Sequence, residues 1–168
     1  MRDEVKDVLR GGMFAGLLGY LTVVVLFALL NVVMGRSPFY TPAMFGAVLF
    51  YGLEDPAALE ITPGPMLAYN MVHVLAFVAL GVFASWLVTK AEEYPVARFA
   101  ILFVLIFVAA HIYAALLLFA QPLLAGSAWW QVGVVSLAAA LAMGWYLMRQ
   151  HPALKRQLTD VPLGDEEG

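Results

Sequence analysis

The first long apolar stretch, residues 12–34, reads GMFAGLLGYLTVVVLFALLNVVM and contains no Asp, Glu, Lys or Arg. A helix needs about 20 such residues to cross the hydrocarbon core of a bilayer. Three more uncharged stretches follow at 66–89, 99–120 and 127–148, and all 21 charged residues lie outside the four. Helices satisfy their own backbone hydrogen bonds in lipid. The sequence therefore predicts an all-α protein whose four transmembrane helices pack as a bundle.

The composition leaves little of the chain for a second domain. The 168 residues are 63% hydrophobic and 12% charged. We expect a cytoplasmic N-terminal segment at 1–10, a membrane domain at 11–150 and a cytoplasmic tail at 151–168. Residues 1–10 form either a short interfacial helix or an extension of the first span. The net charge of -3 gives no reason to expect a nucleic-acid partner, and there is no cysteine for disulfides or thiolate metal sites.

The basic residues predict how the chain is oriented. Arg36 is the one basic residue on the side of the 35–65 connection, and eight lie on the opposite side: Arg2, Lys6, Arg10, Lys90, Arg98, Arg149, Lys155 and Arg156. Basic residues near span ends stay in the cytoplasm. We therefore expect both termini in the cytoplasm.

The outer connection, residues 35–65, is long for a link between helices and contains the apolar run AMFGAVLFY at 43–51. Thr41 and Pro42 resemble an N-cap and a first helical residue, and Gly52 is a natural helix end. The run is too short to span, so we expect an extra interfacial or re-entrant helix. We favour a lid across the outer mouth of the bundle, near Asn70 and His73, over a docking surface or a substrate gate.

Small residues recur at four-residue spacing in three of the spans. The pairs are Gly12 with Gly16, Gly81 with Ser85, and Ala140 with Gly144. Small residues mark contact faces between membrane helices because they let backbones approach closely. We interpret these pairs first as bundle interior and second as an oligomer interface.

Polar side chains inside the spans are rare and tend to face a bundle interior. His73 lies about 10 Å and His111 about 13 Å from the outer ends of their spans at the helical rise per residue. Asn70 shares a face with His73. Together with residues on the first and fourth spans they form a predicted polar layer in the outer half: Asn31, Asn70, His73, His111 and Ser136.

The two histidines permit two interpretations. Opposed imidazoles on facing helices could ligate a haem b iron axially. Hydrogen bonds that hold the helices together are the simpler interpretation, and we favour it. A metal ion alone would need a third or fourth ligand, and the spans hold no carboxylate to supply one.

Ion-coupled transport and enzymatic catalysis find weaker support in the sequence. Ion-coupled carriers keep carboxylates in their spans, and these spans have none. Ser136 with His111 is a possible nucleophile and base, but no acidic residue orients the pair. We expect no catalytic set, although Glu54, Asp55 and Glu60 of the outer loop leave a lipid-modifying activity open.

Three stretches resemble small, functionally uncharacterised multi-pass proteins of the bacterial inner membrane. They are GRSPFYTPAMFGAVLFYG from Gly35, YNMVHVLAF from Tyr69 and MGWYLMRQHPALKRQL from Met143. The resemblance implies four spans and a bacterial inner (plasma) membrane. It implies no substrate, cofactor or catalytic residue.

The sequence thus predicts a non-catalytic membrane protein, a subunit or accessory protein of a larger complex. Its partners would be the lipid bilayer and other membrane subunits or copies of itself. The first alternative is an electron-transfer protein with haem between His73 and His111, and the second is a carrier or channel for a small neutral solute.

Overall fold

The computed structural model describes residues 2–94, 99, 103, 106, 107, 110 and 129–160. Within them the chain forms α1 (Arg2–Val33), α2 (Tyr40–Tyr51), a 3-10 turn η1 (Pro56–Ala58), α3 (Pro63–Glu93), α6 (Trp129–Gln150) and α7 (Pro152–Asp160). The described part contains no strand. The all-α prediction is therefore confirmed.

Three of these helices are long and apolar enough to cross a membrane: α1, α3 and α6. They contain the predicted first, second and fourth spans. The predicted third span, 99–120, lies mostly outside the described residues. The 32 residues of α1 run without a break from Arg2, so the N-terminal segment is an extension of the first span and not a separate interfacial helix.

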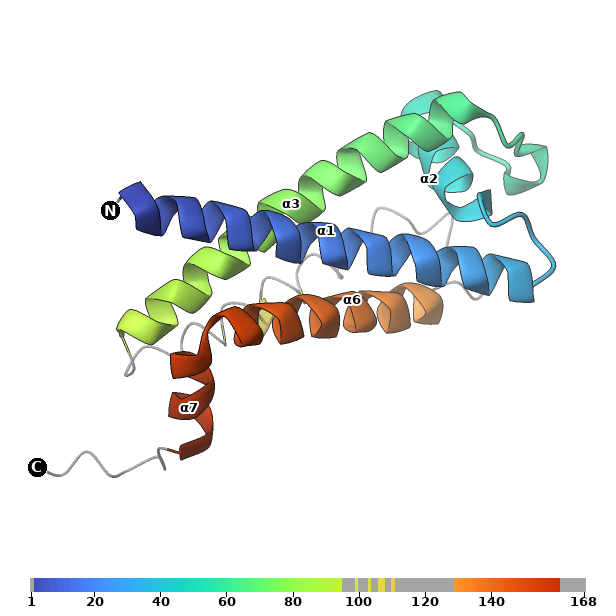
Figure 1. Ribbon diagram of the computed structural model, residues 1–168. Helices are drawn as coiled ribbons and strands as arrows, with labels where there is room; N and C mark the ends of the chain where they lie inside the picture. The colour runs from blue at the N-terminus through green and yellow to red at the C-terminus, as the bar shows by residue number, and fades with distance from the viewer. Residues whose placement is uncertain are drawn as a thin grey trace, which may run out of the picture.

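The start of α1 and the ends of α3 and α6 lie together at one end of the bundle, which we call the inner end (Figure 1). The connection with α2 lies at the opposite, outer end. At the inner end the Lys90 ammonium lies 3.9 Å from a Glu4 carboxylate oxygen, which joins α3 to α1. The two described chain ends therefore lie on the same side of the spans.

Glycines bring α1 and α3 into backbone contact where the two helices cross (Figure 1). A Cβ on Gly12 would collide with the backbone of Val82, and one on Gly81 would collide with the Gly12 carbonyl. A Cβ on Gly16 would likewise collide with the Phe77 carbonyl. The small residues of α1 and α3 therefore form bundle interior, as predicted.

The small pair on α6 has a different position. Ala140 is exposed, and a Cβ on Gly144 would meet no atom within 4 Å. Instead α6 packs on α1 through Val135 and Ala139, which surround Val23. Among the described residues, Ala140 and Gly144 are thus not part of the contact between α6 and α1.

A second apolar cluster closes the inner end. It combines side chains from α1, α3, α6 and α7: Ala15, Ala84, Val88, Ala91, Leu147 and Leu154. Leu154 belongs to α7, and its exposed fraction is only 3%. The tail thus begins with a helix that is part of the fold, which the sequence analysis did not predict.

Candidate functional site

Around His73, α3 presents a column of aromatic rings. Tyr69, His73 and Phe77 are spaced four residues apart, so they share one face of the helix. The His73 ring centroid lies 4.9 Å from that of Tyr69 and 5.0 Å from that of Phe77. Phe45 of α2 extends the column, since its ring stacks on Tyr69 at 5.5 Å. This contact places α2 beside Tyr69, next to the predicted polar layer.

Asn70 connects the column to α1. The Tyr20 hydroxyl donates a hydrogen bond of 2.9 Å to the Asn70 side-chain oxygen, and the Asn70 amide donates one of 2.8 Å to the Met66 carbonyl. The Tyr20 ring also lies 6.0 Å from the His73 ring. Asn70 and His73 are therefore neighbours, as predicted. The sequence analysis missed Tyr20, although a tyrosine in the middle of an apolar span is itself a signal of a polar partner.

One nitrogen of His73 has no bonding partner in the described structure. Its Nε2 atom is buried and accepts or donates no hydrogen bond there. An unsatisfied buried polar atom costs about 1–3 kcal/mol. The nitrogen is thus available to a ligand or to a further polar group. The proposed partner, His111, lies outside the described residues.

Asn31 does not join the polar layer. Its side-chain amide donates a 2.9 Å hydrogen bond to the Thr41 hydroxyl, and the hydroxyl lies 3.2 Å from the Asn31 side-chain oxygen. The amide also lies 3.4 Å from the Pro38 carbonyl. Asn31 is buried and ties the end of α1 to the start of α2. Its position at the outer end of its span placed it beyond the reach of His73.

The structure also corrects the predicted start of α2. The N-cap of α2 is Phe39, which makes no side-chain cap, and the helix begins at Tyr40. The Thr41 hydroxyl bonds to Asn31 and not to the backbone of its own helix. The predicted end is confirmed, because Gly52 adopts a left-handed conformation with φ 68°.

Ser136 is exposed on α6, so the described residues do not bring it into the polar layer. Residue counting gives the depth of a side chain in a span and does not give the rotation of the helix. Its pairing with His111 stays a prediction, because His111 lies outside the described residues.

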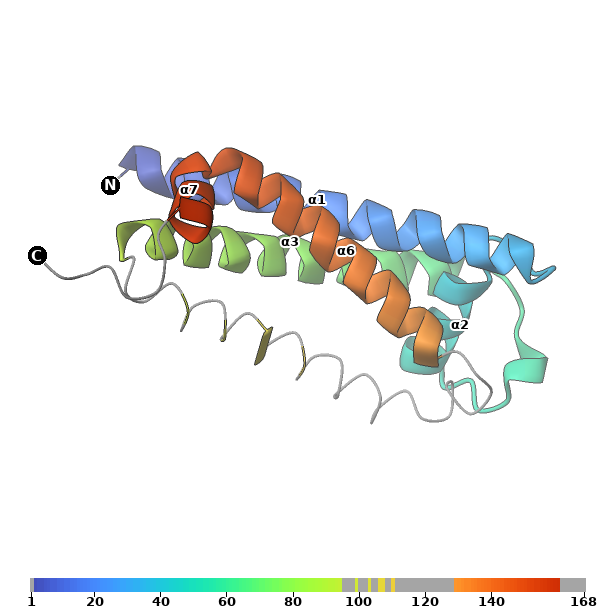
Figure 2. The same cartoon turned by 90° about the horizontal axis from the view of Figure 1, so that it is seen from below.

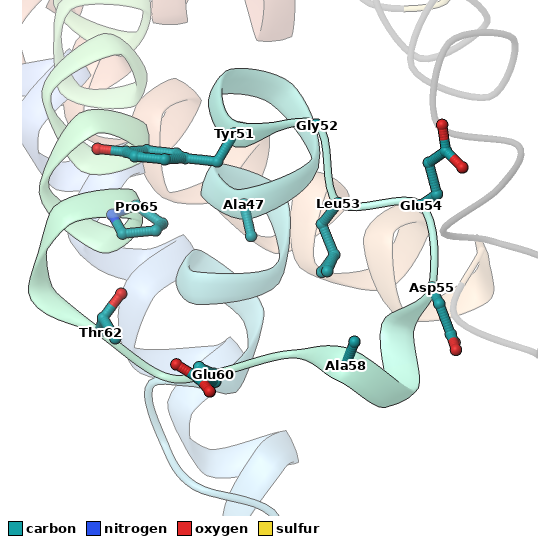
Figure 3. A pocket seen from close by; sticks show the side chains of 10 residues that line it. All are labelled: Ala47, Tyr51, Gly52, Leu53, Glu54, Asp55, Ala58, Glu60, Thr62 and Pro65. Carbon is teal, nitrogen blue, oxygen red and sulfur yellow. The ribbon is translucent and has the colours of Figure 1, made fainter.

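An open depression lies at the outer end between the end of α2 and the start of α3 (Figure 3). Its volume is about 500 Å³, and its rim includes Glu54, Asp55 and Glu60. Figure 3 shows the carboxylates of Glu54 and Asp55 pointing away from the depression. Asp55 accepts a 2.9 Å hydrogen bond from the Ala57 amide and so caps η1. These acids do not converge on a common point.

Metal binding gains no support from the described side chains. No group of three or more His, Asp or Glu residues among them could hold an ion. The site is thus an aromatic and amide cluster with one open imidazole nitrogen. Comparisons of the chain with protein-family models, with curated proteins and with solved structures find no match.

Proposed function

We propose that the chain is a non-catalytic, four-span membrane protein that serves as a subunit or accessory protein of a larger membrane assembly. The observation that carries the proposal is the outward face of α6. Ser136 and Ala140 are exposed there, and Gly144 faces open space. Small residues at four-residue spacing let a second helix approach closely, whereas facing lipid they give little packing. This face therefore suits a helix of a partner subunit or of a second copy.

The proposal includes a place in the cell. We infer a bacterial inner membrane with both termini in the cytoplasm and α2 as an interfacial lid. The inner end of the bundle carries Arg10, Lys90 and Arg149, which supports a cytoplasmic inner end. The outer end carries Glu54, Asp55 and Glu60 beside Arg36.

The test is to place larger side chains on the face of α6 that carries Ala140 and Gly144. Ala140→Leu with Gly144→Leu removes the close approach, so we expect the variant to lose its partner or its self-association. The protein is extracted in mild detergent, and the mass of the native particle is measured by light scattering before and after the substitution. Copurifying membrane proteins are identified by mass spectrometry in both preparations.

The matched control is Val134→Leu, which adds bulk to an exposed position further round the same helix. It should leave the particle mass unchanged. A wild-type protein that runs as a lone monomer, with no copurifying membrane protein, would contradict the proposal. An assembly that survives both leucines would show that α6 is the wrong face.

Haem binding is the second candidate, and the open Nε2 of His73 favours it. A neutral imidazole nitrogen is a usual axial ligand of haem iron. The buried position among aromatic rings fits one such ligand. When bound, the haem would supply one-electron chemistry, and His73 would hold it while the surrounding rings exclude water. The neutral-solute carrier stays a prediction that no observation favours.

An absorption spectrum decides the haem question. A haem protein from haem-replete cells would show a Soret band, and His73→Ala would remove it. Asn70→Ala, one helical turn away, is the control and should keep the band. A colourless wild-type preparation would exclude this function.

A further inference from the structure

The short helix α7 leaves α6 through a sharp turn at His151 and Pro152. Proline disfavours helical backbone in the residue before it, and it is well tolerated as a first helical residue. The His151 amide still bonds to the Leu147 carbonyl of α6, at 3.1 Å, while its carbonyl accepts from the Lys155 amide of α7, at 3.2 Å. One residue therefore ends one helix and begins the next.

The turn directs α7 across the spans. In Figure 1 α7 projects from the side of α6 at a steep angle to it, and in Figure 2 it is seen almost end-on. Because α1, α3 and α6 have the length and composition of spans, a helix steeply inclined to them lies close to the membrane plane. It leaves the bundle on the α6 side, away from α1 (Figure 1).

Glu92 at the end of α3 fixes this direction. One carboxylate oxygen lies 2.8 Å from the His151 Nδ1, and the other accepts a 3.1 Å hydrogen bond from the Leu154 amide. The carboxylate thus satisfies an amide in the first turn of α7, as a capping side chain does. Leu154 anchors the same turn in the inner apolar cluster. The first turn is therefore fixed to the bundle, and the rest projects beyond it.

Basic side chains occupy the solvent side of this helix and the end of α6. Lys155 and Arg156 are exposed on α7. The Arg149 guanidinium lies 4.2 Å from the centre of the Trp145 ring. Trp145 is 56% exposed, and tryptophan and arginine at a span end mark the membrane interface. The helix thus begins within two turns of a residue that marks this interface.

We propose that α7 lies in the headgroup layer and binds anionic phospholipid through Lys155 and Arg156, with Arg149 beside them. The partner follows from charge and position. A basic helix in the membrane plane, next to a lipid-facing span, meets headgroups first. Each basic residue near an anionic surface adds an electrostatic attraction, and salt screens this attraction. Contact with lipid then protects the part of α7 that the bundle does not cover.

Hydrogen exchange on the full chain tests the proposal. The protein is placed in nanodiscs of phosphatidylcholine alone, or of phosphatidylcholine with about one third phosphatidylglycerol, a composition in which surface charge is large. Exchange is followed for the amides of residues 155–160. We expect slower exchange in the anionic discs, by roughly fivefold for each basic residue in contact. About 0.5 M salt should remove most of the difference.

Two variants separate lipid binding from general charge. Lys155→Gln with Arg156→Gln should abolish the difference between the two disc compositions. Lys6→Gln with Arg10→Gln removes the same charge from the inner end of α1 and should preserve it. Equal exchange in both discs would overturn the proposal, since contacts within the protein alone would then hold α7. Loss of the difference in both double variants would also overturn it, because the effect would belong to net charge and not to α7.

Discussion

The two halves of α3 pack against α1 by different means. In the inner half Gly81 meets Gly12 and Gly16 of α1 backbone to backbone, and neighbouring Ala84 and Ser85 are buried. In the outer half the Tyr20 ring of α1 lies beside the His73 ring, and the Tyr20 hydroxyl donates a hydrogen bond to Asn70. Shape fixes the inner contact, whereas rings and hydrogen bonds fix the outer one. Substitutions should therefore cost most in the inner half, where no side chain can move aside.

Gly81→Ala should have the largest effect of the substitutions that test this comparison. The new methyl would meet the backbone of α1, which cannot shift without separating the helices. Overpacking of a tight core typically costs about 1–3 kcal/mol and occasionally more, and we expect the upper end of this range here. Reversible unfolding in detergent measures the loss. Gly11→Ala is the control, because its methyl would lie 3.4 Å from the Ser85 hydroxyl oxygen, an ordinary contact, and should cost little. Equal stability of the two variants would contradict the tight crossing.

Gly46→Ala should have an intermediate and local effect. The methyl would collide with the Pro65 carbonyl, where α2 lies on the start of α3. We expect a loss of about 2 kcal/mol, confined to the outer end. Hydrogen exchange should accelerate in α2 and stay unchanged in α6. Acceleration throughout the chain would mean that the lid is required for the whole bundle.

Tyr20→Phe should have the smallest effect. It removes the hydrogen bond to Asn70 and keeps the ring beside His73. Hydrogen bonds between membrane helices contribute about 0.6 kcal/mol on average. A double-mutant cycle with Asn70→Ala isolates the coupling between the two side chains. A coupling as large as the cost of Gly81→Ala would reverse the comparison, because the outer half would then dominate.

Properties read along the chain were predicted well. Three described helices with the length and composition of spans follow from charge-free runs, and Gly52 ends α2 because the left-handed conformation there favours glycine. Asn70 and His73 came together because one helical turn separates them. These predictions need only local spacing.

Properties that depend on rotation or on distant partners were predicted poorly. Residue counting placed Ser136 along its span but did not predict that its side chain is exposed, since nothing in its own span fixes which side faces α1. Thr41 has an N-cap residue type, but its hydroxyl bonds to Asn31. The residues of α7 carry little apolar signal, and the carboxylate that caps the helix lies 62 positions away, on α3.

The pairing of Asn31 with Thr41 has a consequence for how the protein is made. Ten positions separate the two residues along the chain, whereas Gly12 meets Gly81 only after the whole of α3 has been synthesised. Chains emerge from the ribosome from the N-terminus, and short loops close at small entropic cost. The end of α1 can therefore pair with α2 before α3 exists. During biosynthesis α1 and α2 would then form a corner first. The next helix, α3, would pack against this corner later, through the glycine contact with α1.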